Sequence, residues 1–149
     1  MVALTFDDGP HPEYTDQILD ILEAHNAVAT FFQVGSRLND APEAIQRAVD
    51  LGCEIGSHSN THPKFQKISG EEVLAELSSA DAAFTEVLGH TPSLLRPPYG
   101  SLHEVLDNAG YSIVTWSVDP SDWKCQDTDT VVDYIQNFEH LDGQAILLH

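Results

Sequence analysis

The stretch Val2-Ala3-Leu4-Thr5-Phe6, followed by Asp7-Asp8-Gly9-Pro10, decides the fold class. Its first five residues predict a buried β-strand, because they form a short apolar run rich in β-branched and aromatic side chains. A dinucleotide-binding sheet would carry a glycine-rich fingerprint directly after this strand. Asp7-Asp8-Gly9-Pro10 is not that fingerprint, so dinucleotide binding is not expected.

Outward from this stretch, short apolar runs alternate with helical patterns along the whole chain. The predicted strands span residues 2–6, 29–34, 53–57, 93–96, 112–118 and 144–148. The predicted helices span residues 14–25, 41–51, 70–88, 102–109 and 128–139. This alternation predicts an α/β fold whose parallel strands are joined by helical crossovers, in either an open doubly wound sheet or a barrel.

Local signals mark where several of these helices begin. Ser69-Gly70-Glu71-Glu72 is a capping-box pattern at the start of the third helix, and Ser101-Leu102-His103-Glu104 predicts the same start for the fourth. The last helix is expected to carry one apolar face, formed by Val131, Val132, Ile135 and Phe138.

Composition excludes several functions. The chain has 24 acidic and 6 basic residues and a formal net charge of -18, so nucleic-acid binding, which needs a basic surface, is not expected. No run of about 18 apolar residues occurs, so no membrane-spanning helix is expected. The charge favours either attraction of cationic molecules or solubility alone.

Two cysteines are too few for a disulfide scaffold, and Cys53 lies in an apolar run typical of a core position.

Polar residues of the kinds used in active sites lie directly after the predicted strands. They are Asp7, Asp8, His58, His62, Arg96, Asp119, Asp122 and His149. In a parallel barrel, the carboxyl ends of all strands open on one face, and active sites are built there. Five separate segments are therefore expected to converge on one site.

Asp7-Asp8 and His58-Ser59-Asn60-Thr61-His62 have the composition of a metal site. Two histidines four residues apart can share a helix face or converge in a compact loop, and imidazole suits Zn²⁺. With one carboxylate they would form a site with open positions, suited to catalytic zinc or alternatively to Fe(II). Adjacent residues that leave a strand point in different directions, so the second carboxylate can face a substrate. The competing interpretations are a plain turn and two surface histidines.

Two proline-containing segments are each open to two interpretations. Arg96-Pro97-Pro98-Tyr99-Gly100 is either only a rigid loop, or a support that aims Arg96 at a carboxylate and the Tyr99 N–H at a reacting group. Asp119-Pro120-Ser121-Asp122-Trp123 is either a capped turn with a core indole, or a carboxylate beside a ring that stacks on a sugar.

Taken together, these segments resemble the NodB-type polysaccharide deacetylases, carbohydrate esterase family 4. The motifs that carry the resemblance are Thr5-Phe6-Asp7-Asp8-Gly9, His58-Ser59-Asn60-Thr61-His62, Arg96-Pro97-Pro98-Tyr99-Gly100, Asp119-Pro120-Ser121-Asp122-Trp123 and Leu147-Leu148-His149. The resemblance covers essentially the whole chain and implies a distorted (β/α) barrel of parallel strands with a shallow sugar-binding groove. It implies a single catalytic domain over residues 1–149. Because the family usually continues past the last motif, we expect this domain to be truncated at its C-terminus.

The resemblance also implies a metal site and a base. Asp8, His58 and His62 would bind a divalent metal, usually Zn²⁺, with Co²⁺ or another divalent ion as an alternative. Asp7 would be the catalytic base, and Arg96 would hold it in place. A positive charge beside Asp7 is expected to favour its carboxylate form.

Further roles are implied for the proton donor and the substrate pocket. His149 would be the general acid, and Asp122 would tune it. The backbone N–H of Tyr99 would help to form the oxyanion hole. Trp123 and Leu147 would line the pocket for the acetyl methyl group.

The implied reaction is hydrolysis of N-acetyl groups on N-acetylglucosamine polymers of the chitin or peptidoglycan type. The alternatives are an acetylxylan esterase, a non-catalytic carbohydrate-binding module and, from the ligand set alone, an Fe(II) oxygenase. The expected partner is an acetylated polysaccharide or oligosaccharide, with no nucleic acid and no membrane. The protein is expected to be a monomer, and the resemblance places it outside the cell or at the cell surface.

Overall fold

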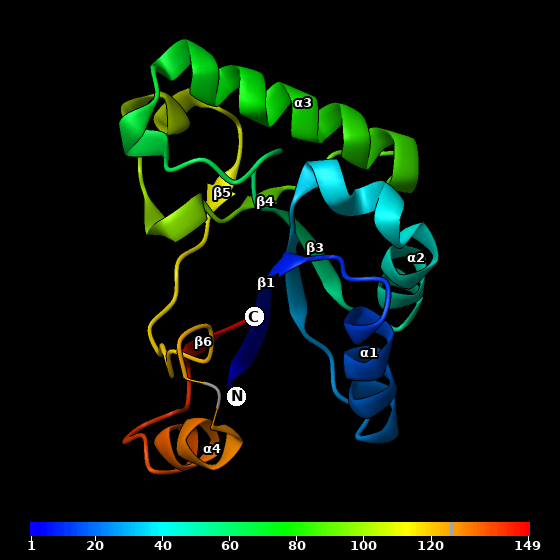
Figure 1. Ribbon diagram of the computed structural model, residues 1–149, viewed down its shortest axis with the longest axis vertical. Helices are drawn as coiled ribbons and strands as arrows, with labels where there is room; N and C mark the ends of the chain where they lie inside the picture. Colours follow the sequence, from blue (N-terminus) through cyan, green and yellow to red (C-terminus); the bar gives the residue numbers. More distant parts are fainter. Residues whose placement is uncertain (126) are drawn as a thin grey trace.

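The computed structural model describes residues 1–125 and 127–149, and its centre is a curled sheet of parallel strands (Figure 1). The strands of this part of the chain are β1 (Ala3–Gly9), β2 (Thr30–Gln33), β3 (Glu54–Ser57), β4 (Leu94–Leu95), β5 (Ser112–Ile113) and β6 (Ala145–Leu148). They lie in the order β5-β4-β3-β2-β1-β6, and every pair is parallel. The predicted α/β class and distorted barrel of parallel strands are therefore confirmed.

Helices cover the outer side of the sheet. The α-helices are α1 (Tyr14–Ala24), α2 (Pro42–Asp50), α3 (Gly70–Leu88) and α4 (Thr128–Gln136). Short 3₁₀ helices lie between them: η1 (Gly35–Asp40), η2 (Phe65–Lys67), η3 (Pro98–Gly100) and η4 (Glu104–Asn108). Among the described residues, no helix is both long enough and apolar enough to cross a bilayer.

Two hydrophobic clusters fix the helices against the sheet. The larger one joins α1, α2 and α3 to β2 and β3, and its most buried members include Leu19, Phe31, Ile45 and Phe84. Cys53 belongs to this cluster, as its apolar run predicted, and the structure has it as a free thiol. The smaller cluster packs α3 and η4 over β4, and consists of Phe65, Val73, Leu77, Leu95 and Leu106.

The two edges of the sheet are linked by the chain that follows β5. The strand predicted over 112–118 pairs with β4 only at Ser112 and Ile113, and Val118 then forms a parallel bridge with Ile146 of β6. Between these points, the carbonyl oxygens of Val114 and Thr115 accept hydrogen bonds from the Arg96 side chain (3.4 and 3.0 Å). The strand is shorter than predicted because a buried side chain, and not a neighbouring strand, binds the carbonyl oxygens of Val114 and Thr115.

Two further boundaries differ from prediction for identifiable reasons. β1 continues through Asp7 and Asp8 to Gly9, so the two carboxylates lie inside the strand and not after it. The helix predicted over 102–109 is the shorter η4, because the Ser101 hydroxyl accepts the backbone N–H of Gln66 (2.9 Å) instead of capping a helix. The capping box at Ser69, in contrast, is present as predicted.

The last helix also differs from its prediction. α4 ends at Gln136, and none of its residues is buried. The predicted apolar face therefore joins neither hydrophobic cluster: Val132 is exposed, while Val131, Ile135 and Phe138 are half-buried.

Candidate active site

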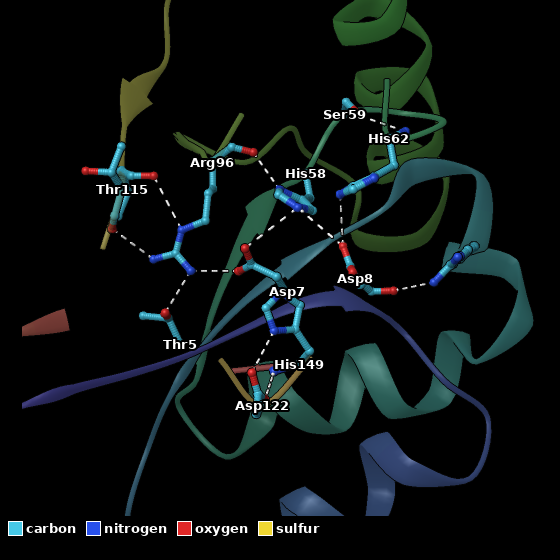
Figure 2. Close-up of polar contacts among 12 residues, drawn as sticks. Thr5, Asp7, Asp8, His58, Ser59, His62, Arg96, Thr115, Asp122 and His149 are labelled. Carbon is cyan, nitrogen blue, oxygen red and sulfur yellow. Dashed lines mark hydrogen bonds and ion pairs between the residues drawn. The ribbon is translucent and has the colours of Figure 1, made fainter. Parts of the chain in front are cut away.

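The end of β1 presents two carboxylates in different directions (Figure 2). Asp7 is buried and its Oδ1 accepts a hydrogen bond from Arg96 Nη1 (2.7 Å). Asp8 is half-exposed and faces His58 and His62 instead. The register of β1 is irregular between Phe6 and Gly9, and Asp8 has a left-handed φ of 69°. The two side chains therefore reach the same site from different directions, so that one carboxylate can be anchored while its neighbour binds a metal.

Asp8, His58 and His62 have the arrangement of a metal site. Oδ1 of Asp8 lies 3.4 Å from Nε2 of His58 and 3.1 Å from Nε2 of His62, and one ligand atom from each of the three lies within 4.8 Å of the others. The same Oδ1 is buried and accepts no hydrogen bond, which is costly unless a cation satisfies it. A divalent cation bound by one carboxylate and two imidazoles fits this donor set.

The orientation of His58 supports the same interpretation. Its Nδ1 lies 2.6 Å from the carbonyl oxygen of Arg96, and the ring is buried. Because a carbonyl can only accept, Nδ1 carries a proton, which leaves Nε2 able to offer its lone pair to a cation beside Asp8. A backbone carbonyl behind a ligating imidazole is a common way to fix its tautomer and orientation.

The backbone at this site is strained. Asp8, Ser59, His62 and Tyr99 all have left-handed φ values, of 69°, 64°, 63° and 59°. Non-glycine residues in such conformations cost about 1–3 kcal/mol each and cluster at functional sites. The sequence offered no signal for this strain, because no glycine occupies any of the four positions.

Arg96 lies fully buried beside the end of β1. In addition to Asp7, its Nη1 donates to the Thr5 hydroxyl (2.7 Å), and its guanidinium lies 4.2 Å from the centre of the Phe32 ring. The Thr5 hydroxyl in turn donates to the carbonyl oxygen of Ile146 (2.6 Å). The Arg96 side chain therefore connects the end of β4 to β1 and, through the Thr5 hydroxyl, to β6.

Arg96 lowers the pKa of Asp7, as expected, but the burial of Asp7 has the larger and opposite effect. Burial raises the pKa of Asp7, and the neighbouring His58 and Arg96 charges offset this rise only in part. Sequence alone could not give this sign, because the burial of the carboxylate is a property of the folded barrel.

His149 and Asp122 form a pair across the pocket from the histidine ligands (Figure 2). Nδ1 of His149 lies 2.9 Å from Asp122 Oδ1, and the backbone N–H of His149 donates to Asp122 Oδ2 (2.7 Å). Burial alone would lower the pKa of His149, but the hydrogen bond and charge of Asp122, with smaller effects of Asp8 and Asp7, raise it overall. The contact with His149 outweighs burial at Asp122 as well and lowers the pKa of that carboxyl.

These groups open into one cavity of about 320 Å³. Its lining residues are Asp7, Asp8, His58, His62, Tyr99, Trp116, Asp119, Trp123, Leu147 and His149. Arg96 and Asp122 lie behind this lining and contact Asp7 and His149. All ten residues assigned roles from the sequence therefore lie at this site.

The exposure of the aromatic side chains at the pocket decides between the two interpretations of Trp123. Trp123 is 62% exposed, so the interpretation of its indole as a core residue is wrong, while Leu147 is buried. The exposed Tyr99 ring packs against His62, with 4.7 Å between the ring centres. Trp116 also lines the cavity but was given no role from the sequence, because it lies within a run that resembled an ordinary strand.

Comparisons with known proteins agree with this geometry. The polysaccharide deacetylase family model matches residues 1–113. The chain is 40% identical over 150 residues to the peptidoglycan-N-acetylmuramic acid deacetylase PdaC of Bacillus subtilis (strain 168), an alignment that covers 100% of this chain and 32% of PdaC. It is 36% identical over 153 residues to the chitooligosaccharide deacetylase of Azorhizobium caulinodans, covering 99% of this chain and 72% of that protein.

A solved structure supports the relationship at the level of the fold. The structure of peptidoglycan deacetylase PdaC from Bacillus subtilis superposes with a TM-score of 0.95 at 40% identity, covering 100% of this chain and 74% of that chain. The chain thus spans about a third of the full length of PdaC. The family resemblance predicted from the motifs is confirmed, and the chain belongs to the polysaccharide deacetylase family.

Proposed function

We propose that this chain is the catalytic domain of a metal-dependent deacetylase that hydrolyses N-acetyl groups on N-acetylglucosamine residues of a polysaccharide or oligosaccharide. The observation that carries the proposal is the placement of Asp8, His58 and His62 beside a buried Asp7, with His149 lining the same cavity. The names of the peptidoglycan and chitooligosaccharide deacetylase relatives support this substrate class. Peptidoglycan lies outside the cytoplasmic membrane, so the peptidoglycan deacetylase relatives support a secreted or cell-surface location as part of the proposal.

Asp8, His58 and His62 would hold the divalent metal, with Zn²⁺ as the ion best suited to this ligand set. When bound, such an ion polarises a carbonyl and lowers the pKa of water at the site. The chain contributes the orientation of its own ligands. Arg96 fixes His58 through its carbonyl oxygen, and the left-handed backbone at Asp8 turns its carboxylate toward both imidazoles.

Asp7 would act as the general base. Arg96 binds its Oδ1, whereas Oδ2 lies 3.7 Å from Nε2 of His58 and faces the metal ligands. Oδ2 is therefore the atom that would take a proton from the attacking water. The raised pKa of Asp7 suits this role, because a carboxylate that holds a proton more readily is a stronger base.

His149 would act as the general acid. Asp122 binds Nδ1 of the ring, so Nε2 is left to donate a proton to the amide nitrogen as the C–N bond breaks. The products are acetate and a free amine. The Tyr99 N–H would stabilise the oxyanion, and Trp123 and Leu147 would contact the acetyl methyl group.

The pH dependence of the reaction should depend on Asp122. His149 must be protonated to act, so activity is present below its pKa and is lost as the pH rises above it. Asp122→Asn weakens the hydrogen bond and removes the charge by which Asp122 raises the pKa of His149, so the alkaline limb of the kcat/KM profile should move to lower pH. The check is a kcat/KM profile of both proteins. An alkaline limb at the same pH in both would contradict the assignment.

Acetate release tests the proposed function as a whole. We expect activity on N-acetylglucosamine oligomers or peptidoglycan, loss after dialysis against a chelator, and recovery with Zn²⁺. Asp8→Ala should remove both zinc binding and activity.

Acetylxylan assayed alongside tests the esterase alternative, and release of acetate from acetylxylan alone would overturn the N-deacetylase assignment. A protein that binds sugar but releases no acetate with metal present would be a binding module.

A further inference from the structure

The loop between the two histidine ligands has no regular secondary structure to hold its shape. It follows β3 and spans residues 58–62. Ser59 and His62, both in this loop, have left-handed φ values of 64° and 63°. Such conformations persist only when surrounding contacts impose them. The position of the second ligand, His62, therefore depends on whatever holds the loop.

Glu76, on α3, binds the middle of this loop with both carboxylate oxygens. Its Oε2 accepts the backbone N–H groups of Asn60 (3.0 Å) and Thr61 (2.7 Å). Its Oε1 accepts the hydroxyl of Thr61 (2.7 Å). Hydrogen bonds to an ionised carboxylate are stronger than those between neutral groups, so this side chain is a firm anchor.

The carbonyl oxygens of the loop bind the backbone at the start of η1 and not α3. The backbone N–H groups of Gly35 and Ser36 donate to the carbonyl oxygens of Ser59 (2.9 Å) and Asn60 (3.0 Å). These contacts run along the backbone and survive any side-chain substitution. The N–H groups of Asn60 and Thr61, in contrast, both bind one side chain, that of Glu76.

His62 is more dependent on the loop than His58 is. His58 lies directly after β3, and a carbonyl oxygen binds its Nδ1. His62 is held by its backbone N–H, which donates to the Ser59 hydroxyl (3.0 Å), and by contact with the exposed ring of Tyr99. A shift of the loop would therefore displace Nε2 of His62 from Asp8 and leave His58 in place.

We propose that Glu76 is a positioning residue that preforms the metal site by fixing the His58–His62 loop. The inference rests on the proposed metal binding by Asp8, His58 and His62. Glu76 is not itself among the ligand atoms that converge at that site. Its effect is exerted through the backbone of Asn60 and Thr61.

Zinc affinity tests this role separately from catalysis. We would titrate the metal-free protein with Zn²⁺ against a chromophoric chelator, at a temperature where circular dichroism shows each variant to be folded. Glu76→Ala should bind Zn²⁺ about 10–100-fold more weakly, the usual effect of losing a residue that orients metal ligands. Glu76→Gln should retain most of the affinity, because its carbonyl oxygen can accept both N–H groups and its amide can donate to the Thr61 hydroxyl.

Glu86→Ala is the control, since Glu86 is an exposed glutamate of the same helix, and it should bind Zn²⁺ as the unmodified protein does. If Glu76→Ala does not fold, Glu76→Asp withdraws the carboxylate by one methylene and should also weaken binding. Unchanged affinity in a folded Glu76→Ala or Glu76→Asp variant would overturn the inference alone. Absence of zinc binding in the unmodified protein would overturn the proposed metal site and the inference with it.

Discussion

Asp7→Asn should lower kcat by about 10²–10⁴-fold, the range expected for loss of a general base. Asparagine has nearly the same shape, and its carbonyl oxygen can still accept the hydrogen bond from Arg96. The amide cannot take a proton from water, so the substitution removes the chemistry while it preserves the packing. The rate of acetate release from an N-acetylglucosamine oligomer measures the effect.

Two accompanying measurements make this result specific to the base. Zinc content should be unchanged in Asp7→Asn, since the proposed ligands are Asp8, His58 and His62. Asp107→Asn, the same chemical change at an exposed position on η4, should leave kcat unaltered. An Asp7→Asn protein that binds zinc and keeps its full rate would show that another group takes the proton.

Arg96→Met should lower the free energy of unfolding by about 3–5 kcal/mol, because it leaves a buried carboxylate without its cation. Asp7 would lose its ion pair, and the carbonyl oxygens of Val114 and Thr115 would lose their donor. Activity should fall as well, since nothing would then hold Oδ1 of Asp7. Urea denaturation of the metal-free protein measures the change in stability.

Two comparisons isolate the cause of that loss. Arg47→Met removes an arginine whose ion pairs with Asp16, Asp20 and Glu23 are on the surface, so it should lower the free energy of unfolding far less than Arg96→Met does. Adding Asp7→Leu to Arg96→Met removes the unpaired anion and should recover part of the stability without recovering activity. A loss in Arg96→Met no larger than that in Arg47→Met would contradict the proposed importance of the buried pair.

The sequence predicted the fold where local patterns determine it. Alternation of apolar runs and helical patterns was enough for the parallel sheet, and the capping box at Ser69 correctly marked the start of α3. Prediction was wrong where a distant group changes the local preference. Ser101 looked like a helix cap, but its hydroxyl binds Gln66, and the strand predicted after Ser112 is shortened by Arg96.

The residues of the site likewise fall into those that local patterns predicted and those that depend on distant contacts. Residues at strand ends could be predicted to converge, because a parallel sheet brings its carboxyl ends to one face. Glu76 could not be found, since in the sequence it is one of several acidic residues on a helix. Its contacts with Asn60 and Thr61 cross 15 or more positions of the chain. The sign of the pKa shift at Asp7 was also hidden, because it depends on burial.

The pairing of β1 with β6 has a consequence for the spacing of the two groups proposed to transfer protons. Phe6 lies opposite Leu148 in this ladder, so Asp7 and His149 each follow a paired residue by one position on neighbouring parallel strands. Neighbouring strands lie about 4.8 Å apart, and side chains at matched positions point to the same side. The β1–β6 ladder thus sets the interval between Asp7, the proposed base, and His149, the proposed acid, through backbone hydrogen bonds, and changes in the surrounding loops would leave that interval unchanged.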